Sequence, residues 1–154
     1  MKSKICGISD SKTLEYLTKH PNSPQYIGFI VNYPKSKRFV EYKKLKKLLK
    51  IEKQNSKYVA VLVQPDEKIF KKIKNLPFDY YQIYDSNPEE IKKFKKEFKK
   101  KIIVAITVKN KNDVLNYQKY KDVANIFLFD SKGYEKSLSF DHKLISDLNL
   151  DQKL

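Results

Sequence analysis

The chain has 154 residues, of which 40% are hydrophobic and 13% aromatic, and its formal net charge is +15 at pH 7. These values predict one globular domain over residues 1–154 and argue against a disordered chain. No apolar run approaches the roughly 20 residues that cross a bilayer, and the N-terminus lacks the apolar segment of a signal peptide. A single cysteine, Cys6, cannot form an internal disulfide, so we expect a cytoplasmic location.

The basic charge raises the question of nucleic-acid binding. Arg38 is the only arginine among the 33 basic residues. Because arginine is favoured for bidentate contacts with phosphate and guanine, this lysine-dominated composition indicates solvated helix faces and not a specific nucleic-acid site. A basic nucleic-acid-binding α/β domain stays open as a third hypothesis, for which we expect only weak, nonspecific binding.

Short apolar runs rich in Val, Ile, Tyr and Phe recur along the chain. Most are continuous and not alternating, which is typical of strands buried on both faces in a parallel sheet. Six such runs are predicted as strands: Lys4–Ile8, Tyr26–Val31, Tyr58–Val63, Tyr80–Tyr84, Ile102–Val108 and Ala124–Asp130.

Lysine-rich stretches with helical spacing separate these runs. Capping or first-turn residues mark three helix starts, at Ser9 or Asp10, at Pro65–Asp66 and at Asn87–Glu90. Apolar residues three and four apart predict buried helix faces, namely Leu45, Leu48 and Leu49 in the second helical stretch and Ile91, Phe94 and Phe98 in the fourth. A further helix is expected over Asp141–Leu148.

This alternation of strand and helix predicts an α/β fold with a parallel sheet. An eight-unit barrel with this period would need roughly 200 residues. The pattern therefore fits either a six-stranded open sheet or an incomplete barrel, and periodicity does not distinguish them.

Local sequence motifs favour the barrel. In order, the matching segments are Lys4-Ile5-Cys6-Gly7-Ile8, Ile27-Gly28-Phe29-Ile30 with Tyr33–Val40, Tyr58–Val63, Tyr81-Gln82-Ile83-Tyr84, Ile102–Ile106, Ile126–Asp130 and Phe140-Asp141-His142. They resemble the strand motifs of phosphoribosylanthranilate isomerases, a tryptophan-pathway family whose best marker is a KICGI-type first strand. The resemblance implies a TIM (β/α)8-barrel fold with about six βα units present, cut off before the last two.

The same resemblance implies an Amadori rearrangement, in which an aminoaldose phosphate opens and becomes an aminoketose. The family's base, a cysteine on the first strand, corresponds to Cys6, and its acid, an aspartate ending the sixth strand, corresponds to Asp130. A thiolate suits the base role near neutral pH, and a carboxylic acid can donate the proton if burial keeps it protonated. Without the motif, Cys6 would be read as a small buried apolar residue and Asp130 as a turn cap.

Two further residues are candidates for substrate binding. Arg38 matches the family arginine that faces the anthranilate carboxylate, a contact suited to a planar bidentate donor. Gln82 is either a substrate contact or a structural hydrogen-bonding residue. No cofactor is implied, and two histidines with one cysteine suggest no metal site. The expected partner is a phosphorylated small molecule, and the sequence predicts no oligomeric state.

The sequence also departs from the family pattern. Tyr84 and Asp85 replace a His and a Gly after the fourth strand, and the usually glycine-rich loop after the sixth strand reads Tyr134–His142. The segments that hold the substrate phosphate after strands seven and eight are not found. We therefore expect little turnover from the 154-residue chain alone, together with open edges at strands one and six and an exposed apolar interior. The alternative function is an inactive barrel fragment or pseudoenzyme that binds a partner.

Overall fold

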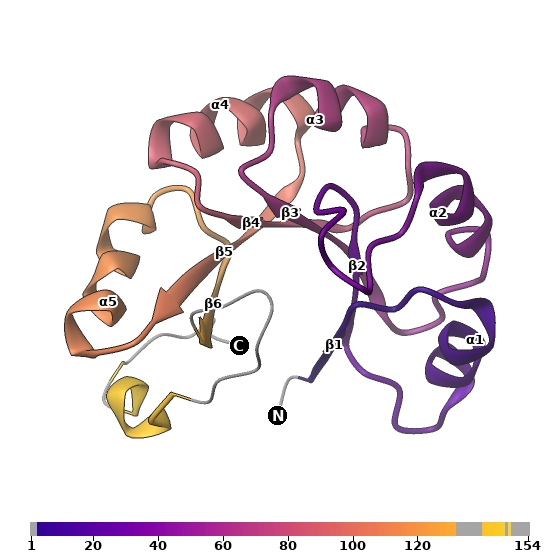
Figure 1. The fold of residues 1–154 in the computed structure, drawn as a ribbon, viewed down its shortest axis with the longest axis horizontal. Coiled ribbons are helices and arrows are strands. Elements are labelled where there is room, and N and C mark those ends of the chain that lie inside the picture. Colours follow the sequence, from indigo (N-terminus) through magenta and orange to yellow (C-terminus); the bar gives the residue numbers. More distant parts are fainter. Residues whose placement is uncertain (1–2, 132–139, 147, 149–154) are drawn as a thin grey trace.

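A computed structural model describes residues 3–131, 140–146 and 148. Its six strands form one parallel sheet in which each strand pairs with the next along the chain. The sheet curls into an open arc, with β1 and β6 at its two edges (Figure 1). The strands are β1 (Lys4–Cys6), β2 (Tyr26–Ile30), β3 (Lys57–Val63), β4 (Tyr80–Tyr84), β5 (Lys101–Val108) and β6 (Ile126–Ser131). The incomplete (β/α)8-barrel arrangement expected from the sequence is confirmed.

Helices lie along the outside of this arc (Figure 1). They are α1 (Ser11–Lys19), α2 (Tyr42–Leu48), α3 (Glu67–Ile73), α4 (Pro88–Phe98) and α5 (Lys111–Leu115), with the 3₁₀ helices η1 (Asn116–Tyr120) and η2 (His142–Ile145). Each α-helix connects two neighbouring parallel strands, which need a crossover of this kind. Among the described residues, no helix has the length and apolar content to cross a membrane.

The core lies between the outer face of the sheet and the helices. Alternate strand residues such as Phe29, Leu62 and Ile83 point into it and are fully or almost fully buried. Phe70 of α3 is also fully buried, and its ring contacts those of Tyr81, Phe94 and Phe98. The predicted apolar faces of the second and fourth helices are thus confirmed as the faces that cover the sheet.

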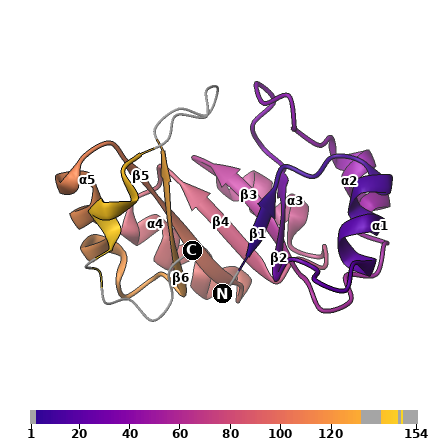
Figure 2. The same ribbon diagram turned by 90° about the horizontal axis from the view of Figure 1, so that it is seen from below.

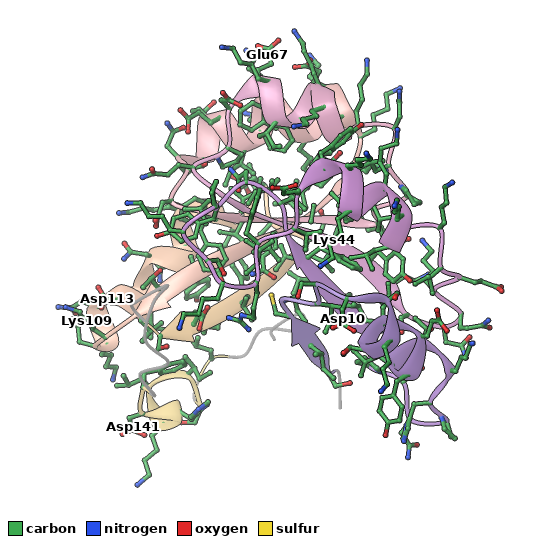
Figure 3. All side chains as sticks on the ribbon, turned by 45° about the vertical axis from the view of Figure 1, so that its right-hand side comes forward. Asp10, Lys44, Glu67, Lys109, Asp113 and Asp141 are labelled. Atoms are coloured by element: carbon green, nitrogen blue, oxygen red, sulfur yellow. The ribbon has the colours of Figure 1, made fainter. Side chains whose placement is uncertain are left out.

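Side-chain caps begin the helices where the sequence predicts them. Asp10, Asp66 and Asn87 accept hydrogen bonds from backbone N–H groups in the first turns of α1, α3 and α4. These caps satisfy donors that a helix start leaves unpaired. Glu67 lies at the outer surface (Figure 3), where it pairs with Lys71 of α3 and Lys93 of α4.

Two element boundaries differ from the prediction. The first strand ends at Cys6 and not at Ile8, because Gly7 has a φ of +84° and turns the backbone out of the strand. The helix expected over Asp141–Leu148 is instead the short 3₁₀ helix η2, which Asp141 caps by accepting from the N–H of Lys143.

The inner face of the sheet also differs from the prediction. We expected its apolar side chains to be exposed, yet Tyr26, Val59 and Ile103 are at most 3% exposed. The curvature of the sheet brings inner side chains together, as the T-shaped contact between the rings of Tyr26 and Tyr80, 5.5 Å apart, illustrates. The expected exposed interior is therefore wrong for these residues, whereas the prediction that β1 and β6 form the sheet edges is confirmed.

Candidate active site

A cavity of about 770 Å³ opens at the C-terminal ends of the strands. The loop after β2 rises beyond the strand ends on this side (Figure 2). The cavity is lined by Lys4, Cys6, Ile30, Tyr33, Lys35, Ser36, Lys37, Arg38, Val61, Val63, Gln82, Tyr84, Leu128, Asp130 and Ser131. The C-terminal end of the strands is where barrel enzymes build their active sites, and all four predicted site residues line this cavity.

Cys6 is the last residue of β1, and its thiol lies on the inner face of the sheet. It pairs in register with Gly28 of β2. A Cβ at position 28 would lie 2.9 Å from the Cys6 sulfur and 3.3 Å from Cγ2 of Val61. Gly28 therefore leaves the space in which the half-buried thiol sits.

Arg38 is held against the end of β1 by its side chain. Its Nη1 donates a hydrogen bond of 3.1 Å to the carbonyl oxygen of Cys6. Its stem passes over Gly7, where a Cβ would come within 2.6 Å of the Arg38 Cδ. The absence of a side chain at Gly7 thus allows the exposed guanidinium to reach the cavity rim beside Cys6.

Asp130 near the end of β6 is part of a hydrogen-bonded chain that crosses the cavity wall. Its Oδ2 accepts from the Tyr84 hydroxyl at 2.7 Å, and its Oδ1 accepts from the N–H of Ser131 at 2.8 Å. The Tyr84 hydroxyl in turn accepts from Nε2 of Gln82 at 3.0 Å. The acid predicted from the sequence therefore also accepts from the backbone of the next residue of its own strand, and Tyr84 and Gln82 of β4 support it.

The Tyr84 hydroxyl lies in the electrostatic field of both predicted catalytic residues. Burial, followed by the negative charge of Asp130 and a smaller contribution from Cys6, raises the pKa of Tyr84 far above its ordinary value. The side chain is only 7% exposed and packs in an inner cluster with Cys6. Tyr84 is therefore a neutral hydroxyl throughout the physiological pH range, located between the candidate base and the candidate acid.

The structure places the predicted residues at different depths. Arg38 is exposed, Cys6 and Asp130 are half-buried, and Gln82 is fully buried. The substrate-binding role of Gln82 stays a prediction, because its amide contacts Tyr84 and its Oε1 has no hydrogen-bond partner among the described residues. Most of the loop after β6 that departs from the family, residues 132–139, lies outside the described residues.

Sequence reasoning missed three residues at this site. Gly28 makes room for the thiol, Lys4 lines the cavity one inner-face position before Cys6, and Tyr84 joins Gln82 to Asp130. The period of two along a strand was the available signal, because it places Lys4 on the face of Cys6 and Tyr84 on the face of Gln82.

The substitution of Asp85 for the family glycine has a structural consequence. Asp85 adopts a φ of +53°, a left-handed conformation that glycine enters without strain. Aspartate is among the few other residues that enter this region with some frequency. The turn after β4 therefore has a left-handed residue although aspartate stands where the family pattern has glycine.

The chemistry available at the cavity is that of a thiol, a carboxyl group, a guanidinium group and several lysines. Within residues 3–131, 140–146 and 148, no group of three His, Cys, Asp or Glu side chains is placed to hold a metal ion. A thiol and a carboxyl group in one cavity can move protons at two positions of a bound molecule.

Comparison with known proteins assigns the family. A family model described as N-(5'phosphoribosyl)anthranilate (PRA) isomerase matches residues 3–154. An N-(5'-phosphoribosyl)anthranilate isomerase of Sulfurihydrogenibium sp. is 30% identical over 152 residues, which cover 98% of this chain and 70% of that protein. One from Petrotoga mobilis is 32% identical, with 97% of this chain and 72% of that protein covered.

Solved structures agree with this assignment. The chain superimposes on the phosphoribosyl anthranilate isomerase of Thermotoga maritima with a TM-score of 0.81 and 25% identity, covering 94% of this chain and 70% of that one. A phosphoribosyl anthranilate isomerase in complex with reduced 1-(o-carboxyphenylamino)-1-deoxyribulose 5-phosphate has the same fold, with a TM-score of 0.75 at 22% identity over 85% of this chain and 65% of that one. This chain belongs to the N-(5'-phosphoribosyl)anthranilate isomerase family.

Proposed function

We propose that this chain carries out the reaction of its family, the isomerisation of N-(5'-phosphoribosyl)anthranilate, with Asp130 as acid and Cys6 as base. The observation that carries the proposal is that both residues line one cavity and both influence the same Tyr84 hydroxyl between them. The inactive-fragment alternative is less favoured, because the family's acid and base are both present and occupy the same cavity.

The first step opens the furanose ring. Asp130 donates its proton to the ring oxygen while the bond between that oxygen and C1 breaks, and the anthranilate nitrogen supplies the electrons that form a C1=N iminium. The ring oxygen becomes a hydroxyl, and Asp130 is left as a carboxylate. The N–H of Ser131 and the hydroxyl of Tyr84 then donate to its two oxygens, which stabilises the negative charge.

The second step forms the aminoketose. Cys6 as a thiolate removes the proton from C2, and the C2–H electrons form a C1=C2 double bond as the iminium nitrogen becomes neutral. The Asp130 carboxylate then takes the C2 hydroxyl proton and the Cys6 thiol returns its proton to C1, which gives the ketone and restores both groups. Gly28 keeps the space around the thiol open, so that the sulfur can approach C2.

Arg38 is proposed to bind the anthranilate carboxylate. Its guanidinium lines the cavity and is anchored at the rim by the bond to the Cys6 carbonyl, and a guanidinium has further N–H donors that can bind a carboxylate. Gln82 is proposed as the second substrate-binding residue through its Oε1, which has no hydrogen-bond partner among the described residues. The ligand is a phosphorylated small molecule, as in the complex named above, and the setting is the cytoplasm, which suits a free thiol.

Complementation of a tryptophan auxotroph that lacks this isomerase tests the proposal. The complete open reading frame that encodes this chain should restore growth without tryptophan, whereas Cys6→Ala and Asp130→Asn should not. Tyr58→Phe is a matched control, because it removes a buried hydroxyl that bonds to Ile51 on the outer layer. Growth of both the Cys6→Ala and the Asp130→Asn strains at the unsubstituted rate would refute the assignment.

A further inference from the structure

The Tyr84 hydroxyl is both a hydrogen-bond acceptor and a donor. It accepts from Nε2 of Gln82 at 3.0 Å and donates to Oδ2 of Asp130 at 2.7 Å. No direct hydrogen bond joins Gln82 to Asp130 in the part of the chain that the structure describes. Gln82 therefore acts on the carboxyl group only through Tyr84.

The direction of these hydrogen bonds fits only the ionised form of Asp130. A carboxylate accepts hydrogen bonds and donates none, so the observed order serves an ionised Asp130. The proposed reaction also needs the protonated acid, which must donate a proton in place of accepting one from Tyr84.

A second orientation of the Gln82 amide would serve the protonated form of Asp130. Gln82 is fully buried, and its Oε1 lacks a hydrogen-bond partner among the described residues. A rotation of the amide by 180° exchanges Oε1 with Nε2 and places an acceptor against the Tyr84 hydroxyl. Tyr84 could then donate to Gln82 and accept the proton that Asp130 holds on Oδ2.

We propose that Gln82 and Tyr84 form a reversible hydrogen-bond relay that positions Asp130 in both its protonation states. The inference rests on the proposed function, because it assigns a role at the acid of that reaction. Tyr84 is a positioning residue, and in this chain it occupies the position where the family pattern has a histidine.

The relay requires that Tyr84 keep its own proton. Burial and the charge of Asp130 raise the pKa of Tyr84, so the hydroxyl remains neutral while the carboxyl group titrates. The other titratable or charged side chains that line the cavity are Lys4 and Cys6 on β1 and Tyr33, Lys35, Lys37 and Arg38 after β2. Substituting only Tyr84 or Gln82 leaves all of these charges in place.

Nuclear magnetic resonance titration of the carboxyl carbon of Asp130 tests the relay without requiring turnover. Tyr84→Phe removes the charge-assisted bond to the carboxylate, which is stronger than the neutral bond it replaces in the acid form. The titration midpoint should therefore move upward when the bond is lost. Tyr58→Phe removes a buried hydroxyl distant from the cavity and should leave the titration midpoint of Asp130 unchanged.

A second substitution tests whether the hydrogen bonds run in order from Gln82 through Tyr84 to Asp130. Gln82→Met should move the midpoint upward by less than Tyr84→Phe does, and the double variant should titrate like Tyr84→Phe alone. In the unsubstituted chain, the side-chain amide resonances of Gln82 should change with the same midpoint as Asp130, and this change should vanish in Tyr84→Phe.

An unmoved midpoint in folded Tyr84→Phe, or additive shifts in the double variant, would overturn the relay. Neither result touches the proposed function, which is tested separately by the growth of the Cys6→Ala and Asp130→Asn strains. In the complete protein, Tyr84→Phe should lower kcat about ten-fold with KM little changed. Loss of kcat without any shift in the alkaline limb of the pH profile would contradict a role through Asp130.

Discussion

Asp79 and Asp130 are half-buried carboxylates at opposite ends of the sheet. At the start of β4, Asp79 accepts from the backbone N–H of Tyr58 and from the Lys53 ammonium group, which lies 2.7 Å from its Oδ2. At the end of β6, Asp130 is joined to Tyr84 and faces a cavity. The Asp79 carboxylate is bonded to a backbone N–H and a lysine. The Asp130 carboxylate is bonded to a tyrosine and lines a cavity that can hold a ligand.

Other polar side chains at the N-terminal end of the sheet also bond to backbone groups. At the N-terminal end, Asn125 accepts from the N–H of Ile102, and Ser56 donates to the carbonyl of Pro24. These bonds satisfy the ends of strands and the loops that enter them. These polar residues therefore support stability at the N-terminal end, whereas the hydrogen-bonded side chains of Gln82, Tyr84 and Asp130 line the cavity at the other end, where barrel enzymes place their chemistry.

Arg38 gives the largest expected effect on KM at the C-terminal end. Arg38→Met removes the proposed contact with the substrate carboxylate and should raise KM about 100-fold, because bonds between charged groups are the strong ones. Arg38→Lys keeps the charge but loses the planar pair of donors, so about a 10-fold rise is expected. Steady-state kinetics of the complete protein measures both values, and an unchanged KM in both variants would exclude this role.

Asn125 tests whether side chains bonded to backbone stabilise the N-terminal end of the sheet. Asn125→Ala leaves the N–H of Ile102 without its side-chain acceptor, which should lower the free energy of unfolding by about 2 kcal/mol. Asn112→Ala, at an exposed position on α5, should change it by less than about 0.5 kcal/mol. Urea denaturation measures both, and equal stabilities for the two variants would remove the distinction between them.

The strands and most helix starts were predictable because their signals are local. Continuous apolar runs and capping residues lie within a few positions of one another, as Asp66 and Asn87 show. The length of the first strand was overestimated, because a positive φ at Gly7 ends β1 at Cys6, and glycine adopts either sign of φ without a local sequence signal. The bond between Tyr84 and Asp130 joins residues 46 positions apart, and such a contact depends on how strongly the sheet curls.

Gly28 tests whether the space left by a missing side chain on β2 controls the position of the Cys6 thiol. Gly28→Ala places a methyl carbon 2.9 Å from the Cys6 sulfur, which is closer than van der Waals contact, so the sulfur must move. We expect turnover to fall about ten-fold. Because Cys6 is the only cysteine, its alkylation rate in the 154-residue chain reports the displacement directly. An unchanged alkylation rate would show that Gly28 does not control the thiol.

The smallest effect is expected on the outer helices, away from the cavity. Lys99 ends α4 with a φ of +50°, so Lys99→Gly should relieve strain and raise the free energy of unfolding by about 1 kcal/mol. Lys96→Gly, three residues earlier within the same helix, should lower it by about 1 kcal/mol. Thermal denaturation gives the sign of each change, and two destabilising results would contradict the assignment of Lys99 as a strained cap.

The most direct test compares Asp130→Asn with Asp79→Asn in the complete protein, with turnover and the free energy of unfolding measured on the same samples. We predict that Asp130→Asn lowers kcat by at least about 100-fold and leaves stability within about 1 kcal/mol. Asp79→Asn should lose about 2 kcal/mol of stability and keep kcat within about two-fold. Near-normal turnover in Asp130→Asn, or an equal loss of turnover in Asp79→Asn, would contradict the account.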